Sequence, residues 1–162
     1  MQAKAVPEGA SPVIPRLVCR DAAAEIEFCR GVFGAELGVS RSAPDGKVGH
    51  AMMLFNGAML MIEAEWPALP SRAPAADGSS PVVIYVYVAD VDRVVDLARA
   101  RGARVLYEPQ DQFWGDRVAW LQDPEGHVWT VASRVENTTE NQRRERWAAE
   151  LAGNRGAQAK PR

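Results

Sequence analysis

The chain has 162 residues and a formal net charge of −2, and 47% of its residues are hydrophobic. This length and apolar fraction suit one ordinary domain, or two small modules that share a core. The near-neutral charge argues against a general affinity for nucleic acid or an anionic membrane. No apolar run reaches the roughly 18 residues of a membrane span. The N-terminal stretch MQAKAVPEGASPVIP lacks the apolar core of a signal peptide.

The first half of the chain contains signals for one helix and four strands. The expected elements are a strand at 13–19, a helix at 22–33, and strands at 35–40, 48–55 and 58–65. Asp21 is a good N-cap for the helix, and Gly34 ends it. Asn56-Gly57 is the strongest short signal for a β-hairpin. Residues 1–12 are predicted to be disordered, and residues 66–80, rich in Pro, Ala, Gly and Ser, are predicted to be a linker.

The same order of elements returns in the second half. The expected elements are a strand at 82–89, a helix at 91–100, a strand at 103–107, a loop at 108–115, and paired strands at 116–122 and 127–134. Asp90 follows Asp21 by 69 residues, and the turn glycine Gly126 follows Gly57 by the same 69. A fixed offset indicates an internal repeat. The predicted organisation is two βαβββ modules, 13–65 and 81–136, followed by a charged helix and tail at 137–162, capped by Asn137 or Thr139.

Three stretches carry a resemblance to a known family: IPRLVCRDAAAEIEFCRGVFGAEL, VGHAMMLFNGAMLMIEAE and FWGDRVAWLQDPEGHVWTVASRVE. Paired βαβββ modules, a strand ending in Asp before the helix, and D-P-x-G before the last strand resemble the vicinal oxygen chelate superfamily, in its glyoxalase-like, bleomycin-resistance-like branch. The resemblance covers residues 13–136. It implies an α+β fold in which a U-shaped, curved mixed sheet of eight strands surrounds a cleft, with the first strands of the two modules paired together. It also implies assembly as a homodimer, which closes the remaining sheet edges by exchange or by side-by-side association.

In metal-dependent members of that superfamily, the ligands come from the first and last strands of each module. The resemblance places these positions at Ile14, Met61, Val83 and Thr130. A divalent metal of this class needs imidazole or carboxylate ligands, which Ile, Val and Met cannot supply. We therefore expect no metal and no other cofactor at the usual place. This departure argues against lactoylglutathione lyase, dioxygenase and metal-dependent fosfomycin activities.

Strand alternation predicts which side chains of the first module line the cleft. The two-residue turn places His50 opposite Glu63, on the same face as Arg16. His50 could be a general base oriented by Glu63, or the two could form a structural cross-strand pair. Arg16 could clamp a carboxylate or phosphate, or could pair with Glu63 at the rim.

In the second module, the same reasoning directs Tyr85, Tyr87 and Thr130 into the cleft. The tyrosines could stack on a planar ligand or partly fill the sheet. Arg117 is a second candidate clamp, and the alternative is a rim position or an ion pair. Trp114 lies in the loop that should border the cleft, where it could contact a ligand or pack within the loop.

The turn Asp123-Pro124-Glu125-Gly126 sets the register of the second hairpin. Four turn residues would pair Gln122 with His127, which places Arg117 in the cleft. Trp120 and Trp129 would then face away from it, into the core. His127 is expected to bond to backbone at the end of the turn.

Two functions of different classes fit these features. The first is a metal-free protein that binds a small amphipathic or aromatic molecule, preferably anionic or hydrogen-bonding, because two guanidinium groups would face it. The second is a glyoxalase-like lyase or isomerase, or a dioxygenase-related enzyme, with a metal displaced onto His50 and Glu63. Cys19 and Cys29 form no metal or redox motif and are expected to be free buried thiols of a cytoplasmic protein.

Overall fold

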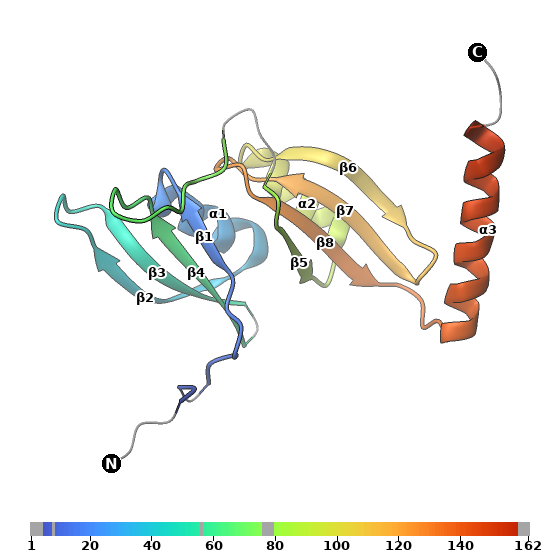
Figure 1. Ribbon diagram of the computed structural model, residues 1–162, viewed down its shortest axis with the longest axis horizontal. Coiled ribbons are helices and arrows are strands. Elements are labelled where there is room, and N and C mark those ends of the chain that lie inside the picture. The colour runs from blue at the N-terminus through green and yellow to red at the C-terminus, as the bar shows by residue number, and fades with distance from the viewer. Residues whose placement is uncertain (1–4, 8, 56, 76–79, 159–162) are drawn as a thin grey trace.

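The computed structural model describes residues 5–7, 9–55, 57–75 and 80–158, which form two βαβββ modules and a C-terminal helix (Figure 1). Module one contains β1 (Arg16–Cys19), α1 (Ala22–Phe33), β2 (Glu36–Ser42), β3 (Val48–Phe55) and β4 (Ala58–Ala64). Module two contains β5 (Val83–Tyr87), α2 (Val91–Ala100), β6 (Arg104–Asp111), β7 (Asp116–Gln122) and β8 (Val128–Arg134), and α3 (Glu140–Gln158) follows it. The predicted α+β class and the repeat are confirmed. The predictions for residues 1–4, 8, 56, 76–79 and 159–162 lie outside the described residues.

Local capping explains why the helices begin where the sequence predicts. The Asp21 carboxylate accepts hydrogen bonds from Ala23 N and Ala24 N at 3.1 and 3.0 Å, and the Asp90 carboxylate accepts one from Arg93 N at 3.0 Å. These bonds satisfy amide groups that have no partner inside the helix. Thr139 caps α3, since its hydroxyl accepts from Gln142 N at 3.3 Å.

Each module has its own mixed sheet, with strand orders β1-β4-β3-β2 and β5-β8-β7-β6. The first strand of each module runs parallel to the last, and the other neighbours are antiparallel. Within the described residues no ladder joins β1 to β5. The expected pairing of first strands in one eight-stranded sheet is therefore not found within the chain, and both strands keep an unpaired edge.

The strand β6 is longer than predicted and ends at Asp111 rather than Tyr107. Proline cannot donate a ladder hydrogen bond, so Pro109 does not favour the interior of a sheet. However, β6 is an edge strand, and its register shifts between Tyr107 and Gln110. A bulge on an edge strand is a place where proline is tolerated.

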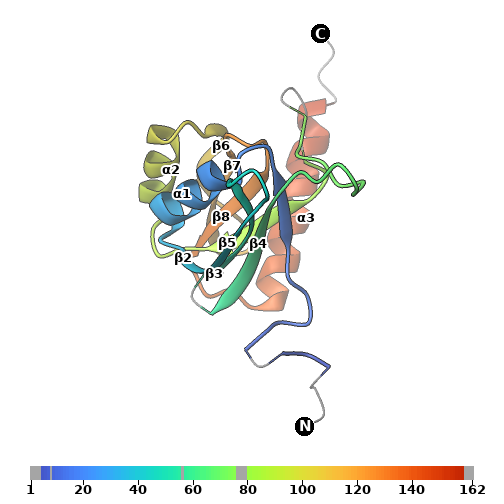
Figure 2. The ribbon, with the colours of Figure 1, turned by 90° about the vertical axis from the view of Figure 1, so that its left-hand side faces the viewer.

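Helices α1 and α2 contact each other and cover one face of the two sheets, so the opposite face is left without a helix from the modules (Figure 2). The modules share one core, since the Trp129 ring of β8 lies 4.8 Å from the Phe33 ring of α1, centroid to centroid. His127 makes the expected backbone contact, with Nε2 3.0 Å from Val18 O in the other module. None of the described helices combines the length and apolar character needed to span a membrane.

A carboxyl group is buried under α1. Glu25 is 1% exposed, and its Oε2 has no hydrogen-bond partner in the described structure. The Cys29 thiol donates to Oε1 at 3.4 Å. Burial, together with the nearby charge of Asp123, raises the pKa of Glu25 well above its ordinary range.

Candidate functional site

A cavity of about 630 Å³ opens on the second sheet, on the face that bears the aromatic side chains of β5 and β7. We call it the aromatic cavity, and it is lined by Val83, Tyr85, Leu106, Tyr107, Gln112, Trp114, Val118, Trp120 and Thr130. None of these nine described residues is charged. Val118 and Thr130 are buried, whereas the rings of Tyr85, Tyr107 and Trp120 are well exposed. Large aromatic surfaces exposed around one hollow are typical of a binding site.

The register of β7 against β8 determines this lining. Trp120 pairs with Thr130, and Gln122 pairs with Val128. Five residues, 123–127, connect the strands, and Asp123 N donates to His127 O at 3.0 Å. The four-residue turn that the sequence suggested is therefore wrong by one residue, and such a slip turns every side chain of a strand to the other face. Trp120 lines the cavity instead of the core, while Trp129 is buried, as predicted.

The observed register also places Arg117 on the other side of the sheet from the one expected. Its Nε and Nη2 donate to the two carboxylate oxygens of Asp92, in the first turn of α2, at 2.7 and 2.8 Å. Its Nη1 donates to Asp111 Oδ1 at 3.0 Å. Arg117 therefore lies on the helix-covered side of the sheet, and the prediction that it lines the cleft is wrong. Without it, the reason for expecting an anionic ligand is weakened.

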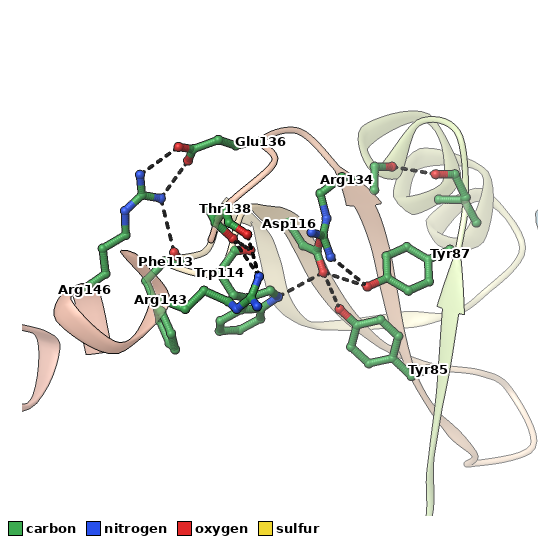
Figure 3. A network of polar contacts seen from close by, with 12 residues as sticks. Tyr85, Tyr87, Phe113, Trp114, Asp116, Arg134, Glu136, Thr138, Arg143 and Arg146 are labelled. Atoms are coloured by element: carbon green, nitrogen blue, oxygen red, sulfur yellow. Dashed lines mark hydrogen bonds and ion pairs between the residues drawn. The ribbon is translucent and has the colours of Figure 1, made fainter. Parts of the chain in front are cut away.

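Asp116 lies beside the cavity, at the centre of a network of hydrogen bonds (Figure 3). Its side chain is 1% exposed. Its Oδ2 accepts hydrogen bonds from Tyr87 Oη at 2.9 Å, Tyr85 Oη at 3.2 Å and Trp114 Nε1 at 3.0 Å. Arg134 Nε donates to the other oxygen. This carboxylate thus brings together three residues that the sequence placed at the site: Tyr85, Tyr87 and Trp114.

The tyrosine hydroxyls in this network are donors. Burial, followed by the effects of Tyr87 and Asp116, raises the pKa of Tyr85. The phenol therefore keeps its proton near neutral pH and its hydrogen bond to the carboxylate. The ring positions of Tyr85 and Trp114 are fixed at their polar ends, and their carbon faces remain available to the cavity.

A second polar group lies on module one. His50 Nδ1 is 3.1 Å from Glu63 Oε1, as the predicted register requires, and Arg16 Nη1 is 3.3 Å from Glu63 Oε2. Glu63 thus holds a histidine and an arginine side by side on one sheet. None of these three residues lines the aromatic cavity. The polar group of His50, Glu63 and Arg16 therefore lies on the first sheet, and the aromatic cavity lies on the second.

The residues at the expected metal positions do not fit a divalent metal. Met61 pairs with Arg16 and Met52 in the first sheet, and Val83 and Thr130 line the aromatic cavity. The side chains of Ile14, Met61 and Val83 have no oxygen or nitrogen donor. Over the described parts of the chain, no three His, Cys, Asp or Glu side chains converge on a point where they could hold a metal ion.

Sequence reasoning missed several contributors to this site, namely Asp116 and the lining residues Leu106, Tyr107, Gln112, Val118 and Trp120. Asp116 and Trp120 would have been found by the same alternation rule if the hairpin connection had been counted as five residues. Tyr107 lies inside the strand expected at 103–107, but the register shifts on both sides of it, between Val105 and Tyr107 and between Tyr107 and Gln110, so simple alternation did not place it in the cavity. The omissions of Asp116, Trp120 and Tyr107 follow from a turn or a bulge, where strand parity changes by one residue.

Comparison with known proteins gives one consistent family. The model of the Glyoxalase/Bleomycin resistance protein/Dioxygenase superfamily matches residues 12–131. An uncharacterised protein of Mycobacterium bovis, Mb0911c, is 39% identical over 125 residues, which is 75% of this chain and 82% of that protein.

Solved structures agree with this at the level of the fold. TioX from Micromonospora sp. ML1 is 27% identical, with a TM-score of 0.61 over 77% of this chain and 99% of that one. The fosfomycin resistance protein FosX from Listeria monocytogenes, in a complex with Mn(II) and sulfate ion, has a TM-score of 0.58 over 85% of this chain and 97% of that one. Since FosX is only 18% identical, its likeness concerns the fold alone.

Proposed function

Because the chain belongs to the Glyoxalase/Bleomycin resistance protein/Dioxygenase superfamily, we propose that it is a metal-free binding protein whose aromatic cavity takes a small, planar, amphipathic molecule. One observation carries the proposal: an uncharged aromatic cavity is combined with residues at the family's metal positions that include no imidazole or carboxylate. The volume of about 630 Å³ lies within the usual range for small-molecule sites.

The lining offers both stacking faces and a polar anchor. Tyr85, Tyr107, Trp114 and Trp120 present rings, and an aromatic contact contributes about 0.5–1.5 kcal/mol beyond the area that it buries. Thr130 lines the cavity, and its hydroxyl has no hydrogen-bond partner among the described residues. It would bond to a polar atom of the ligand.

The charges around the cavity favour a neutral or cationic ligand over an anionic one. Arg117 is held on the other side of the sheet, and the Arg134 guanidinium is paired with Asp116. Tyr85 and Trp114 donate to the Asp116 carboxylate, which makes their rings richer in electrons. Electron-rich ring faces attract cations and offer nothing to an anion.

We also propose that the protein is a homodimer. Strands β1 and β5 each have an unpaired edge, and β5 carries exposed apolar side chains at Val83, Tyr85 and Tyr87. A second copy that covers these edges would prevent the open strands from pairing with other chains and aggregating. Sedimentation at micromolar concentration tests this, and a monomer would contradict it.

A second candidate is a glyoxalase-like lyase or isomerase that uses His50 and Glu63. The observation in its favour is the distance of 3.1 Å between the imidazole and the carboxylate, which suits a general base with a fixed tautomer. Two side chains are too few for tight metal binding without a ligand from elsewhere. Metal analysis of the purified protein separates the form of this candidate that has a metal displaced onto His50 and Glu63 from the first candidate.

A matched pair of dyes tests the binding proposal. N-phenyl-1-naphthylamine and 8-anilinonaphthalene-1-sulfonate share their ring system, but only the second is an anion. We expect the neutral dye to bind more tightly. Trp120→Ala should weaken its binding by about 1 kcal/mol, and Trp66→Ala, which removes an exposed tryptophan outside the cavity, should not. Equal affinity of the parent and Trp120→Ala would refute the proposed site.

A further inference from the structure

The C-terminal helix α3 lies beyond residues 12–131, which the family model covers, and stands at the end of the second sheet (Figure 1). Its contacts with the module concentrate on two short segments. One is the loop between β6 and β7, which carries Phe113 and Trp114, and the other is the chain that leaves β8 through Glu136 and Thr138. The helix thus touches the module next to a wall of the aromatic cavity.

An arginine of α3 joins these two segments. Arg146 Nη1 and Nη2 each lie 2.7 Å from an oxygen of the Glu136 carboxylate, and Nη1 also donates to Phe113 O at 3.2 Å (Figure 3). This bidentate geometry needs the planar fork of a guanidinium, which lysine lacks. The loop is therefore tied to the helix through its backbone.

A chain of rings leads from the helix to the cavity. The centroids of Trp147 and Phe113 are 5.2 Å apart, and those of Phe113 and Trp114 are 4.9 Å apart. Trp114 lines the cavity, and its indole N–H donates to Asp116. The contacts of α3 thus end on a side chain that would touch the ligand.

The backbone of the loop is held at the same point. Thr138 Oγ1 donates to Trp114 O at 2.9 Å, and Arg143 Nη1 donates to Thr138 O at 2.7 Å. Gly115 has a φ of +93°, and a Cβ there would lie 2.3 Å from Glu136 O. The chain that leads to α3 therefore passes so close to the loop that only glycine fits.

We propose that α3 positions Trp114 and thereby sets the affinity of the aromatic cavity, with Arg146 and Trp147 as positioning residues. The inference rests on the proposed function, because it concerns the site where the ligand binds. A loop that is already ordered loses less entropy when a ligand arrives, and immobilising one large side chain costs about 0.5–1.5 kcal/mol. Release of the loop should therefore weaken binding about two- to tenfold.

The first test needs no ligand. In protein labelled with 5-fluorotryptophan, the ¹⁹F resonance of Trp114 is assigned from a Trp114→Phe variant. Trp147→Ala and Arg146→Ala should shift or broaden this resonance, and Trp147→Phe, which keeps a ring against Phe113, should leave it near its original position. Arg144→Ala is the matched control, because among the described residues the hydrogen bond of this arginine reaches only Asn141 in the same helix. An unchanged Trp114 resonance in both Trp147→Ala and Arg146→Ala would overturn the inference.

The second test measures the affinity for N-phenyl-1-naphthylamine. We expect a two- to tenfold loss in Trp147→Ala and Arg146→Ala, as estimated above from the cost of ordering one side chain, and the parent affinity in Arg144→Ala. If Trp120→Ala weakens binding but the two helix variants do not, the role of α3 is refuted and the proposed site stands. If Trp120→Ala has no effect, the proposed function fails, and the ¹⁹F result alone decides whether α3 orders the loop.

Discussion

Tyr87 on β5 donates to Asp116 on β7 across 2.9 Å, although β8 lies between these two strands in the sheet. The bond is possible because both side chains are on the face that no module helix covers. The same carboxylate accepts from Tyr85 and Trp114. One buried charge therefore ties the first strand of the module to the start of β7 and to the loop before it.

Asp116→Asn should destabilise the protein by about 1.5–3 kcal/mol, because the hydrogen bonds that it weakens are made to a charged acceptor. The amide also turns an NH₂ group toward donors that need an acceptor. Urea unfolding measures the change. Asp111→Asn is the control, since this carboxylate is exposed, and it should cost less than about 1 kcal/mol. Equal losses in both variants would contradict the central role of Asp116.

Arg117→Ala should leave the affinity of the cavity for N-phenyl-1-naphthylamine unchanged. Its guanidinium is occupied by Asp92 and Asp111 on the other side of the sheet. These hydrogen bonds raise the pKa of Arg117, but the carboxylates are largely exposed, so the loss of stability should stay within about 1 kcal/mol. Fluorescence titration and urea unfolding give the two values. A clear loss of affinity would mean that β7 has the register first expected from the sequence.

Several parts of the fold could be predicted from local signals in the sequence. The bounds of α1 and α2 follow from local signals, namely an aspartate at each N-cap and an apolar face at helical spacing. The pairing of His50 with Glu63 follows from a two-residue turn, which fixes the register of its strands.

The register of the second hairpin, β7 against β8, was harder to predict, because a connection of four or of five residues fits the sequence. The choice depends on the contact between Asp123 N and His127 O, which composition does not reveal. That single residue decided whether Arg117 or Trp120 lines the cavity. The position of α3 against the loop of Trp114 was also not predictable, since it depends on contacts distant in sequence such as Arg146 with Phe113.

Chelation should leave the stability of the protein unchanged. The side chains of Ile14, Met61 and Val83 offer no ligand, so we expect far less than one zinc, nickel, iron or manganese ion per purified chain. EDTA should not alter the melting temperature. Elemental analysis and a thermal melt with and without chelator check this. One tightly bound metal per chain, lost together with stability, would instead favour a site displaced onto His50 and Glu63.

Trp129→Ala should destabilise the protein by about 3–5 kcal/mol, the usual cost of removing a large core aromatic. Trp129 is 1% exposed, contacts Phe33 of the other module, and donates from its indole to Asp123 Oδ2 at 2.7 Å. Trp120→Ala removes the same side chain from an exposed position, so its cost should be much smaller. Urea unfolding of the two variants compares them directly, and similar losses would contradict the placement of Trp129 in the core and of Trp120 at the exposed face.

Glu25→Gln should stabilise the protein at neutral pH and flatten its pH dependence. Burial and the charge of Asp123 raise the pKa of Glu25 in the folded state above the ordinary value of 4.5, which applies when the chain is unfolded. Between these two pKa values the folded state binds more protons than the unfolded state. The free energy of unfolding therefore falls as pH rises from about 4.5 toward the raised pKa. Glutamine cannot titrate, and its amide oxygen can still accept from the Cys29 thiol.

The measurement is urea unfolding of the parent and Glu25→Gln at several pH values from 4 to 8. Burial raises the pKa of the Cys29 thiol well above its ordinary value, so the thiol stays protonated over this range. Asp123 interacts with Glu25, so the difference between the two curves reports the titration of Glu25 together with its effect on Asp123. The variant should match the parent at the acidic end and exceed it increasingly as pH rises. Glu27→Gln, two residues along α1 on its exposed face, should give a curve parallel to that of the parent. A parallel curve for Glu25→Gln as well would show that Glu25 is ionised in the folded protein at neutral pH.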